Sequence, residues 1–387
     1  MCIVVNFSTL SHQSNNSLRI MKIAILNPIL FTATDGLIPT VTTIKDTMIY
    51  GMCLAFKKLG HEVTLIALDD YRASQPENYD FEIVFLKGMC QRVLTNALPF
   101  SPQLWKWLKI NQSKFDMVIS SETFSFHSLF AALLCPNKTI IWQELTAHQN
   151  KLHKIPSKIW HNIIARFLMK NVKCVVARST KAKKFIAQYM PLVSDKIIDH
   201  GIDIDKFKFS ASKEKQIISS SQLIHRKNVD GIIHKYAKFH KIPGYENFKL
   251  IIAGRGEQES QLKDLAKGLN LDGFVEFVGF LPQIELNRYI RTSMAFLVNT
   301  RKDLNMVSIP EAIVSGTPIL TNLQPASADF VIKYKLGIAK QEWDENDIKE
   351  IVDNNTEYVK NCVEYRYKLS SEYAAQDFIN IYNNEQR

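Results

Sequence analysis

The stretch Lys249-Leu-Ile-Ile-Ala-Gly-Arg-Gly256 is a short apolar run that stops at two glycines, and residues 258–269 after it carry apolar side chains at helical spacing. The same order of strand, tight turn and helix recurs around it. Further strands are expected at 216–219, 274–278, 295–299 and 318–321, and further helices at 229–240, 284–293 and 310–315. Strands that alternate with helices predict a parallel sheet covered on both faces.

The first half of the chain repeats this pattern. It opens with a strand at 22–26 and a helix at 44–59. Further strands are expected at 63–67, 83–86, 117–120, 139–142 and 174–177. We therefore expect an α/β protein of two doubly wound domains, at 21–198 and 199–364. Residues 1–20 are expected to be a disordered leader, and residues 365–387 a helix that packs back on the first domain.

Length and composition agree with two globular domains. The chain has 387 residues, 46% of them hydrophobic, and its apolar runs are far shorter than the roughly 20 residues that span a bilayer. The six cysteines are scattered, without a Cys-x-x-Cys pair or a Cys/His cluster at metal-ligand spacing. This favours a reduced, cytoplasmic compartment and no metal site.

The positive charge is concentrated in one half. The net charge is +10, and residues 87–187 hold sixteen Lys or Arg against Asp116, Glu122 and Glu144. Such a surface attracts nucleic acid, an anionic membrane or a phosphorylated substrate. Cations alternate with large apolar residues in Trp105-Lys-Trp107-Leu-Lys109, in Lys151-Leu-His-Lys154 and at 159–170, as in an interfacial membrane segment. A solvated basic face whose aromatic rings point to the core is the alternative.

Ligands of open parallel sheets lie beyond the carboxyl ends of the strands, so the turns that follow strands are candidate sites. In one of them, Arg226 and Lys227 precede a helix and would neutralise a diphosphate. A solvated basic turn is the alternative. The pair Gly254-x-Gly256 lacks a third glycine and by itself indicates only a tight turn.

A third turn lies between Asp303 and Glu311. A helix that begins near Ser308 would aim the amides of Met306, Val307 and Ser308 at a ligand, with the two carboxylates on either side of it. The same residues also fit a capping box, in which Glu311 accepts from the backbone amide of Ser308. Both interpretations remain open at this point.

The motifs together resemble GT-B glycosyltransferases of the retaining family four (glycosyl transferases group 1). The resemblance covers residues 21–320 and is weak at 87–170. Its motifs are Met21-Lys-Ile-Ala-Ile, Gly60-His-Glu-Val-Thr64, His200-Gly-Ile-Asp203-x3-Phe207, Gln222-Leu-x3-Lys227-Asn-Val-Asp230, Leu250-Ile-Ile-Ala-Gly254-x-Gly256, Val275-x-Phe-Val-Gly279-Phe280 and Glu311-Ala-x3-Gly316-x-Pro318.

The resemblance implies two Rossmann-like domains that face each other across a cleft. The second would hold a nucleoside-diphosphate sugar, a UDP-sugar in the favoured case, and the first an acceptor. Lys227 would contact the diphosphate and Glu311 the ribose, while Gly279 and Phe280 would lie at the base. Asp303 falls where the family usually has Glu beside the transferred sugar.

Several positions depart from the family pattern. Gln222 stands where an Arg commonly helps Lys227, which leaves Arg226 to supply the second charge. Leu304-Asn-Met-Val307 replaces a glycine-rich turn, and the Gly-Gly turn before the first helix is absent. Trp142-Gln-Glu144 occupies the stretch of the family histidine. Glu144 is a candidate base or orienting group for an acceptor hydroxyl, with a plain structural carboxylate as the alternative.

Retaining transfer builds negative charge on the departing diphosphate, and cations aimed at it lower the barrier without a metal. The pair Asp203-Ile-Asp205 resembles a metal motif of another transferase class, but its place in the linker favours a turn. We expect no cofactor besides the donor. The expected enzyme extends a surface polysaccharide on a glycan or lipid-linked acceptor, in the cytoplasm or at the inner face of the membrane.

Three other functions remain. A nucleotide-sugar epimerase shares the fold, and a catalytically inactive partner subunit would explain the missing glycines and arginine. A basic nucleic-acid-binding protein is suggested by charge and by Trp105 and Trp107 alone, without a recognised module. No nucleic-acid partner is therefore expected.

Overall fold

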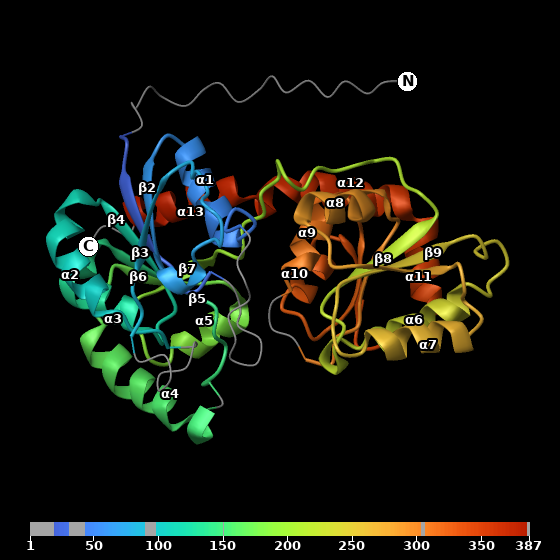
Figure 1. Ribbon diagram of the computed structural model, residues 1–387, viewed down its shortest axis with the longest axis horizontal. Coiled ribbons are helices and arrows are strands. Elements are labelled where there is room, and N and C mark those ends of the chain that lie inside the picture. Colours follow the sequence, from blue (N-terminus) through green and yellow to red (C-terminus); the bar gives the residue numbers. More distant parts are fainter. Residues whose placement is uncertain (1–18, 31–42, 90–97, 150, 303–305, 385–387) are drawn as a thin grey trace.

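The computed structural model describes residues 19–30, 43–89, 98–149, 151–302 and 306–384 (Figure 1). They form two α/β lobes, each with one parallel sheet between helices. Within the described part of the first lobe, the strand order is β3-β2-β1-β4-β5-β6-β7. These strands are β1 (Lys22–Leu26), β2 (Glu62–Leu68), β3 (Glu82–Leu86), β4 (Met117–Ser121), β5 (Thr139–Gln143), β6 (Cys174–Ala177) and β7 (Val193–Ile197).

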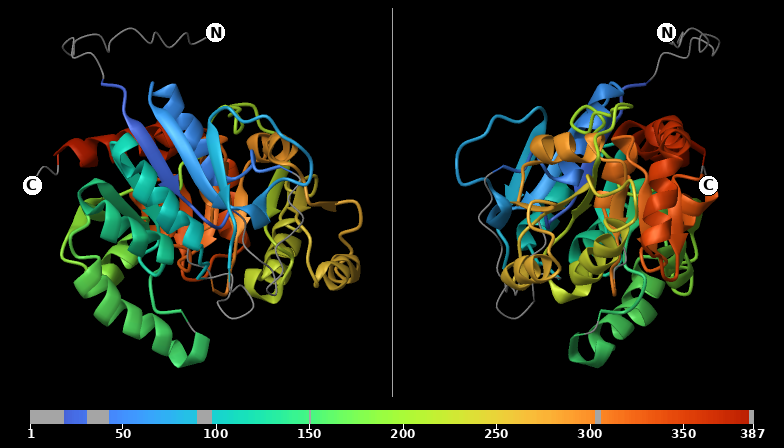
Figure 2. Two further views of the ribbon diagram at one scale, coloured as in Figure 1. Left: turned by 60° about the vertical axis from the view of Figure 1, so that its left-hand side comes forward. Right: turned by 90° about the vertical axis from the view of Figure 1, so that its right-hand side faces the viewer.

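Both faces of the first sheet are buried. On β1, Ile23 and Ile25 pack toward α1 (Met48–Lys58), while Ala24 and Leu26 pack toward α2 (Pro102–Asn111) and α3 (Phe126–Leu134). Figure 2 (left) shows α2 and α3, in teal, in front of the blue strands. The lobe also contains α4 (Ile155–Ile159), which continues as the π-helix η5 (Trp160–Leu168), then α5 (Thr180–Ile186) and the short turns η1 (Asp69–Tyr71), η2 (Gln112–Lys114), η3 (Pro136–Lys138) and η4 (Lys151–Lys154).

The second lobe repeats the design. In its described residues the strand order is β10-β9-β8-β11-β12-β13, and the strands are β8 (Gln216–Ser220), β9 (Lys249–Ala253), β10 (Val275–Gly279), β11 (Phe296–Val298), β12 (Ile319–Asn322) and β13 (Gly337–Lys340). Its helices are η6 (His225–Lys227), α6 (Val229–Phe239), α7 (Glu259–Gly268), α8 (Gln283–Thr292), α9 (Ser308–Val314), α10 (Ala328–Lys333), α11 (Glu345–Asp353) and α12 (Asn355–Tyr365).

The last helices return toward the first lobe. After η7 (Arg366–Leu369), helix α13 (Ser371–Asn384) packs on α1, and Ala375 and Phe378 belong to the core that contains β1. Ion pairs reinforce this joint: Lys58 Nζ lies 2.6 Å from Asp205 Oδ2 and 2.7 Å from Glu372 Oε1. The first lobe is thus tied both to the linker and to the end of the chain.

The structure confirms the α/β class and the parallel sheets, with some differences in detail. Helix α1 begins at Met48 rather than at residue 44, because the Thr47 side chain accepts from the amide of Tyr50 and caps it there. The edge strands β7 and β13 were not expected. The predicted leader falls mostly on residues 1–18, outside the described residues. No helix in the described ranges is long and apolar enough to cross a membrane.

The strand orders define where ligands can bind. In each sheet the chain first moves to one side and then crosses to the other, so the order reverses between β1 and β4 and again between β8 and β11. Loops that leave such a pair of parallel strands diverge to opposite faces and leave a crevice. Each lobe therefore has a crevice at the carboxyl edge of its sheet.

Candidate functional site

The crevice between β8 and β11 contains a pocket of about 530 Å³. It lies at the carboxyl ends of β8, β9 and β10, and residues at the start of α9 close it on one side. Most of the side chains predicted for the donor site meet here. Its lining residues are Ser220, Ser221, Gln222, Lys227, Ala253, Gly254, Arg255, Phe280, Leu281, Leu286, Met306, Val307 and Ser308.

Glycines bring two of the pocket loops together. Gly254 has φ +136°, and a Cβ there would lie 1.8 Å from the carbonyl oxygen of Ser221. A Cβ at Gly256 would lie 2.3 Å from the carbonyl oxygen of Leu223, whose amide donates to the carbonyl of Arg255 at 2.9 Å. Glycine is therefore needed at residues 254 and 256 because the two loops are in close contact there. A tight turn alone would not need two glycines.

The turn that carries Lys227 is held in place by its neighbours. The carbonyl of Arg226 accepts from the amide of Arg301 at 2.9 Å and from the hydroxyl of Thr300 at 3.1 Å. Asn228 follows with φ +55° and starts α6. These bonds join the loop after β8 to the loop after β11, so Lys227 reaches the pocket from a fixed backbone.

Arg226 does not accompany Lys227 into the pocket. Its guanidinium donates to the carbonyl of Lys302 at 3.2 Å, and Arg226 is not among the lining residues. The second cation of the pocket is Arg255, between the two glycines, which the sequence reasoning missed. A cation inside a glycine turn at a strand end was the signal that could have found it.

Phe280 lines the pocket, and Gly279 before it supports the neighbouring loop. Phe280 is 71% exposed and lines the pocket, where its ring offers an apolar surface to a planar ligand. Gly279 has φ +71°, and its carbonyl accepts from the amide of Gly254 at 2.7 Å. Gly279 thus supports the loops of the pocket through its backbone.

Helix α9 begins at Ser308, as predicted, but without a capping box. Val307 is its N-cap, and the amide of Glu311 donates to the carbonyl of Val307 at 3.1 Å. Met306, Val307 and Ser308 line the pocket at the β8/β11 crevice, as expected for the donor site. Asp303, the other carboxylate expected beside the sugar, lies outside the described residues.

Glu311 lies in an adjoining pocket of about 280 Å³, and Val307 lines both this pocket and the first one. The residue is 9% exposed, and burial raises the pKa of its carboxyl to about 7. Glu311 and Lys227 therefore reach neighbouring spaces on the two sides of Val307, and the structure does not place them in one cavity.

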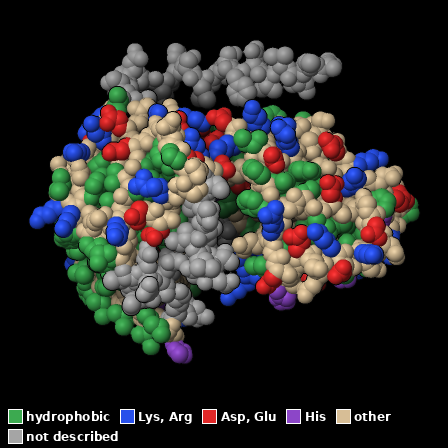
Figure 3. Space-filling view, viewed as in Figure 1, with side chains coloured by type: hydrophobic (Ala, Val, Ile, Leu, Met, Phe, Trp, Pro, Cys, Tyr) green, Lys and Arg blue, Asp and Glu red, His purple; other side chains and the backbone are tan. Residues whose placement is uncertain are grey.

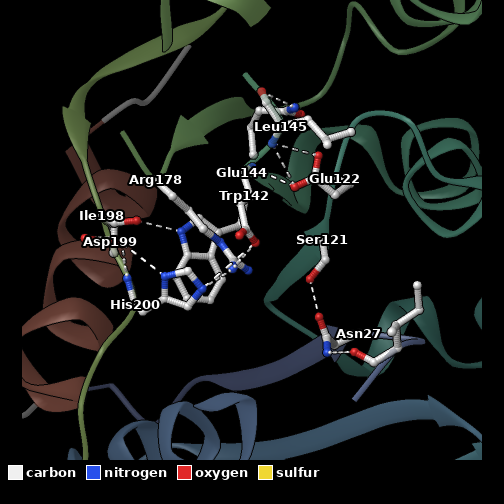
Figure 4. Close-up of polar contacts among 12 residues, drawn as sticks. Asn27, Ser121, Glu122, Trp142, Glu144, Leu145, Arg178, Ile198, Asp199 and His200 are labelled. Atoms are coloured by element: carbon white, nitrogen blue, oxygen red, sulfur yellow. Dashed lines mark hydrogen bonds and ion pairs between the residues drawn. The ribbon is translucent and has the colours of Figure 1, made fainter. Parts of the chain in front are cut away.

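A third pocket, of about 460 Å³, occupies the crevice of the first lobe between β1 and β4. Asn27 follows β1 and Ser121 ends β4, and the Ser121 hydroxyl donates to Asn27 Oδ1 (Figure 4). Glu144, the predicted acceptor-side carboxylate, also lines it, and so does Val307 from the second lobe. Val307 is therefore common to all three pockets, and the pocket of the first lobe is lined in part by the second lobe.

The Glu144 carboxylate is fixed by a buried guanidinium. Arg178 Nη1 donates to Glu144 Oε2 at 2.8 Å and to His200 Nε2 at 2.8 Å, and the Arg178 guanidinium lies 3.9 Å over the ring of Trp142 (Figure 4). Since Arg can only donate, His200 Nε2 accepts, and its Nδ1–H is left to donate to Asp199 Oδ1 at 3.1 Å. Sequence reasoning missed Arg178 because no motif marks it.

Glu122 lies next to Glu144 and is partly buried. Its Oε1 accepts from the amide of Glu144 at 2.7 Å and from the amide of Leu145 at 3.3 Å (Figure 4). Burial, followed by the nearby charge of Glu144, raises the pKa of Glu122 to about 7. Glu122 thus positions the backbone at Glu144, and it also lines the pocket of the first lobe.

The linker carboxylates serve as turn and ion-pair groups. Asp203 Oδ1 accepts from the amide of Asp205 at 3.0 Å, and Asp205 pairs with Lys58. In the part of the chain that the structure describes, no three His, Cys, Asp or Glu side chains gather as a metal site would require.

Comparison with known proteins agrees with this geometry. Residues 202–370 match the family described as glycosyl transferases group 1, and residues 46–206 match glycosyltransferase family 4. The α-monoglucosyldiacylglycerol synthase of Streptococcus pneumoniae is 21% identical over 330 residues, which are 79% of this chain and 72% of that protein. The amylovoran biosynthesis glycosyltransferase AmsK of Erwinia amylovora is 30% identical over 149 residues, 36% of each chain.

Solved structures show the same fold. HepE from Anabaena, in complex with UDP, superposes with a TM-score of 0.65 at 13% identity, covering 94% of this chain and 100% of that one. The two family matches meet at the linker between the lobes and together extend over residues 46–370. The chain therefore belongs to the group 1, family-four-like glycosyltransferases and has the GT-B fold.

Proposed function

We propose that the protein transfers a sugar, with retention of anomeric configuration, from a nucleoside-diphosphate sugar to a glycan or lipid-linked acceptor in the synthesis of a surface polysaccharide or glycolipid. The observation that carries this proposal is the donor pocket at the β8/β11 crossing, with Lys227 and Arg255 on its wall. AmsK is named for polysaccharide biosynthesis and the streptococcal synthase for a glycolipid, which supports these acceptor classes.

The donor is proposed to be a UDP-sugar. HepE has been solved with UDP and with UDP-glucose, and its fold covers almost all of this chain. In this chain Phe280 would stack on the base, while Lys227 and Arg255 would hold the diphosphate. Arg255 would then compensate for Gln222, which stands where relatives of this family commonly have an Arg.

The reaction is proposed to need no metal. As the bond between the anomeric carbon and the diphosphate oxygen breaks, negative charge grows on the diphosphate, and the two cations stabilise it. The acceptor hydroxyl then bonds to the anomeric carbon from the same face as the departing oxygen. Its proton leaves with that diphosphate oxygen, so that configuration is retained.

The acceptor is proposed to enter the pocket of the first lobe. Glu144 lies at this pocket and is held by Arg178, so its carboxylate has one orientation from which to accept a hydrogen bond from an acceptor hydroxyl. We assign it the orienting role and leave proton removal to the leaving group. A lipid-linked acceptor would place the enzyme at the cytoplasmic surface of a membrane.

A panel of nucleotide sugars, incubated with the protein in the presence of a chelator, tests this proposal. Slow release of UDP from one sugar donor, with the α-anomer preserved in any transfer product, is the expected result. Release that requires added metal would contradict metal independence, and an inverted product would contradict retention. If no donor is cleaved although UDP binds, the inactive partner subunit becomes the better description.

A further inference from the structure

The helix formed by α4 and η5 has an outward face that is unusual for a protein in water. Four apolar residues follow one another at four-residue spacing, Ile155, Ile159, Ile163 and Phe167, and each is between 52% and 60% exposed. Residues four apart lie on one side of a helix, so these side chains form a continuous strip, which we call the apolar ridge. Figure 3 shows hydrophobic side chains gathered along this lower part of the first lobe.

The ridge is exposed even though the helix makes core contacts on its other side. Its opposite face is buried: Trp160 packs edge-on against Phe124 and Phe126, and its Nε1–H donates to the carbonyl of Thr123 at 2.8 Å. Ala165 is fully buried on the same side. The helix is therefore held in place by its buried face, and this orientation leaves the apolar ridge pointing outward.

Cations accompany the ridge. Lys154, Lys158 and Arg166 each precede a ridge residue by one position, and all three are exposed. Residues 145–194 around this helix contain ten Lys or Arg and no Asp or Glu. Two copies of such a surface would repel each other, whereas an anionic surface with an apolar interior satisfies both the charges and the ridge.

We propose that the apolar ridge and its flanking cations dock the enzyme on an anionic phospholipid bilayer. The ridge side chains enter the boundary between headgroups and acyl chains, and Lys154, Lys158 and Arg166 stay among the lipid phosphates. This deepens the proposed function, on which it rests for the lipid-linked acceptor. The proposed contact with the membrane lies on the helix formed by α4 and η5, outside the three pockets.

Vesicle sedimentation with the full chain tests the docking surface. The wild type is expected to pellet at low salt with vesicles of equal parts phosphatidylcholine and phosphatidylglycerol, and hardly at all with phosphatidylcholine alone. The double variant Ile159→Glu/Phe167→Glu should reduce the bound fraction on the order of tenfold or more, since two apolar contacts are replaced by charges that lipid phosphates repel.

Matched variants separate the ridge from general adsorption. Ile284→Glu/Ile332→Glu replaces two residues of similar exposure on α8 and α10 of the other lobe and should pellet like the wild type. Lys158→Gln/Arg166→Gln should weaken pelleting and flatten its dependence on salt. UDP binding and the melting temperature are measured for every variant, so that loss of fold or of the donor site is distinguished from loss of docking.

Each of the following outcomes would contradict the proposal. The wild type could fail to pellet with anionic vesicles at low salt, or the ridge variant could pellet like its control. The ridge variant could also convert a dimer to a monomer in lipid-free sedimentation without changing pelleting, which would assign the ridge to a second copy. On the unmodified protein, hydrogen exchange at 155–168 should slow when anionic vesicles are added, and unchanged exchange would count against the proposal.

Discussion

Arg178 Nη1 lies 2.8 Å from Glu144 Oε2, and through this pair a buried guanidinium fixes a carboxylate that lines the pocket of the first lobe. The same Nη1 also donates to His200, the residue that opens the linker to the second domain. The orientation of Glu144 is thus fixed by a guanidinium that also binds a residue of the linker between the two lobes.

Glu144→Gln should lower kcat by on the order of 10²-fold or more, because a neutral amide accepts a weaker hydrogen bond from an acceptor hydroxyl than a carboxylate does. The KM for the donor should stay nearly the same. Steady-state kinetics on the identified donor and acceptor measure this. Glu62→Gln, an exposed carboxylate at the opposite edge of the same sheet, is the control, and equal loss in both variants would refute the role of Glu144.

The buried carboxyl of Glu311 predicts a pH dependence of stability. Its pKa is about 7 in the folded protein and near 4.5 when unfolded, so between these values the folded state binds more protons and stability falls as pH rises. Urea unfolding of the wild type should lose about 1 to 3 kcal/mol between pH 5 and pH 8 from this group. Glu311→Gln should show a shallower decline, and an identical decline would contradict the assignment.

Arg255→Gln should weaken UDP binding about tenfold while leaving uridine binding unchanged, because the guanidinium is proposed to contact the diphosphate and not the nucleoside. Titration calorimetry with both ligands gives the comparison. Arg288→Gln, an exposed arginine of α8 that lines no part of the donor pocket, is the matched control. Equal weakening of UDP and uridine would mean that Arg255 acts on the fold of the loop.

Gly254→Ala tests the contact of the two pocket loops. A Cβ would overlap the carbonyl of Ser221 in a backbone with φ +136°, so the free energy of unfolding should fall by about 2 kcal/mol or more. Thermal and urea unfolding measure the loss. Gly268→Ala, where a Cβ meets nothing within 4 Å, should leave stability unchanged or raise it by up to about 1 kcal/mol. Wild-type stability in Gly254→Ala would show that the loops can separate.

Much of the fold could be read from local pattern. Apolar runs such as 249–253 are buried strands because they are too short for helices and end at glycine, and their regular alternation with helices dictates a parallel sheet. The edge strands β7 and β13 escaped prediction because an edge strand need not be apolar: β7 reads Val-Ser-Asp-Lys-Ile and is largely exposed on its last three residues.

Only part of the candidate site could be predicted from the sequence. Lys227 and the start of α9 were predicted to approach each other because both follow strands of one sheet, and they share a pocket. Arg255 and Arg178 could not be found this way. The position of Arg255 depends on two loops that touch through Gly254, and the partners of Arg178 come from residues 144 and 200, which the fold alone brings together.

The central claim is that Lys227 holds the diphosphate of a nucleotide donor in the pocket between β8 and β11. Titration calorimetry of UDP on the wild type, on Lys227→Ala and on Lys238→Ala, an exposed lysine of α6, tests it most directly. We predict saturable UDP binding that is at least about tenfold weaker in Lys227→Ala and unchanged in Lys238→Ala. UDP binding of equal strength in all three proteins, or no binding to the wild type, would contradict the claim.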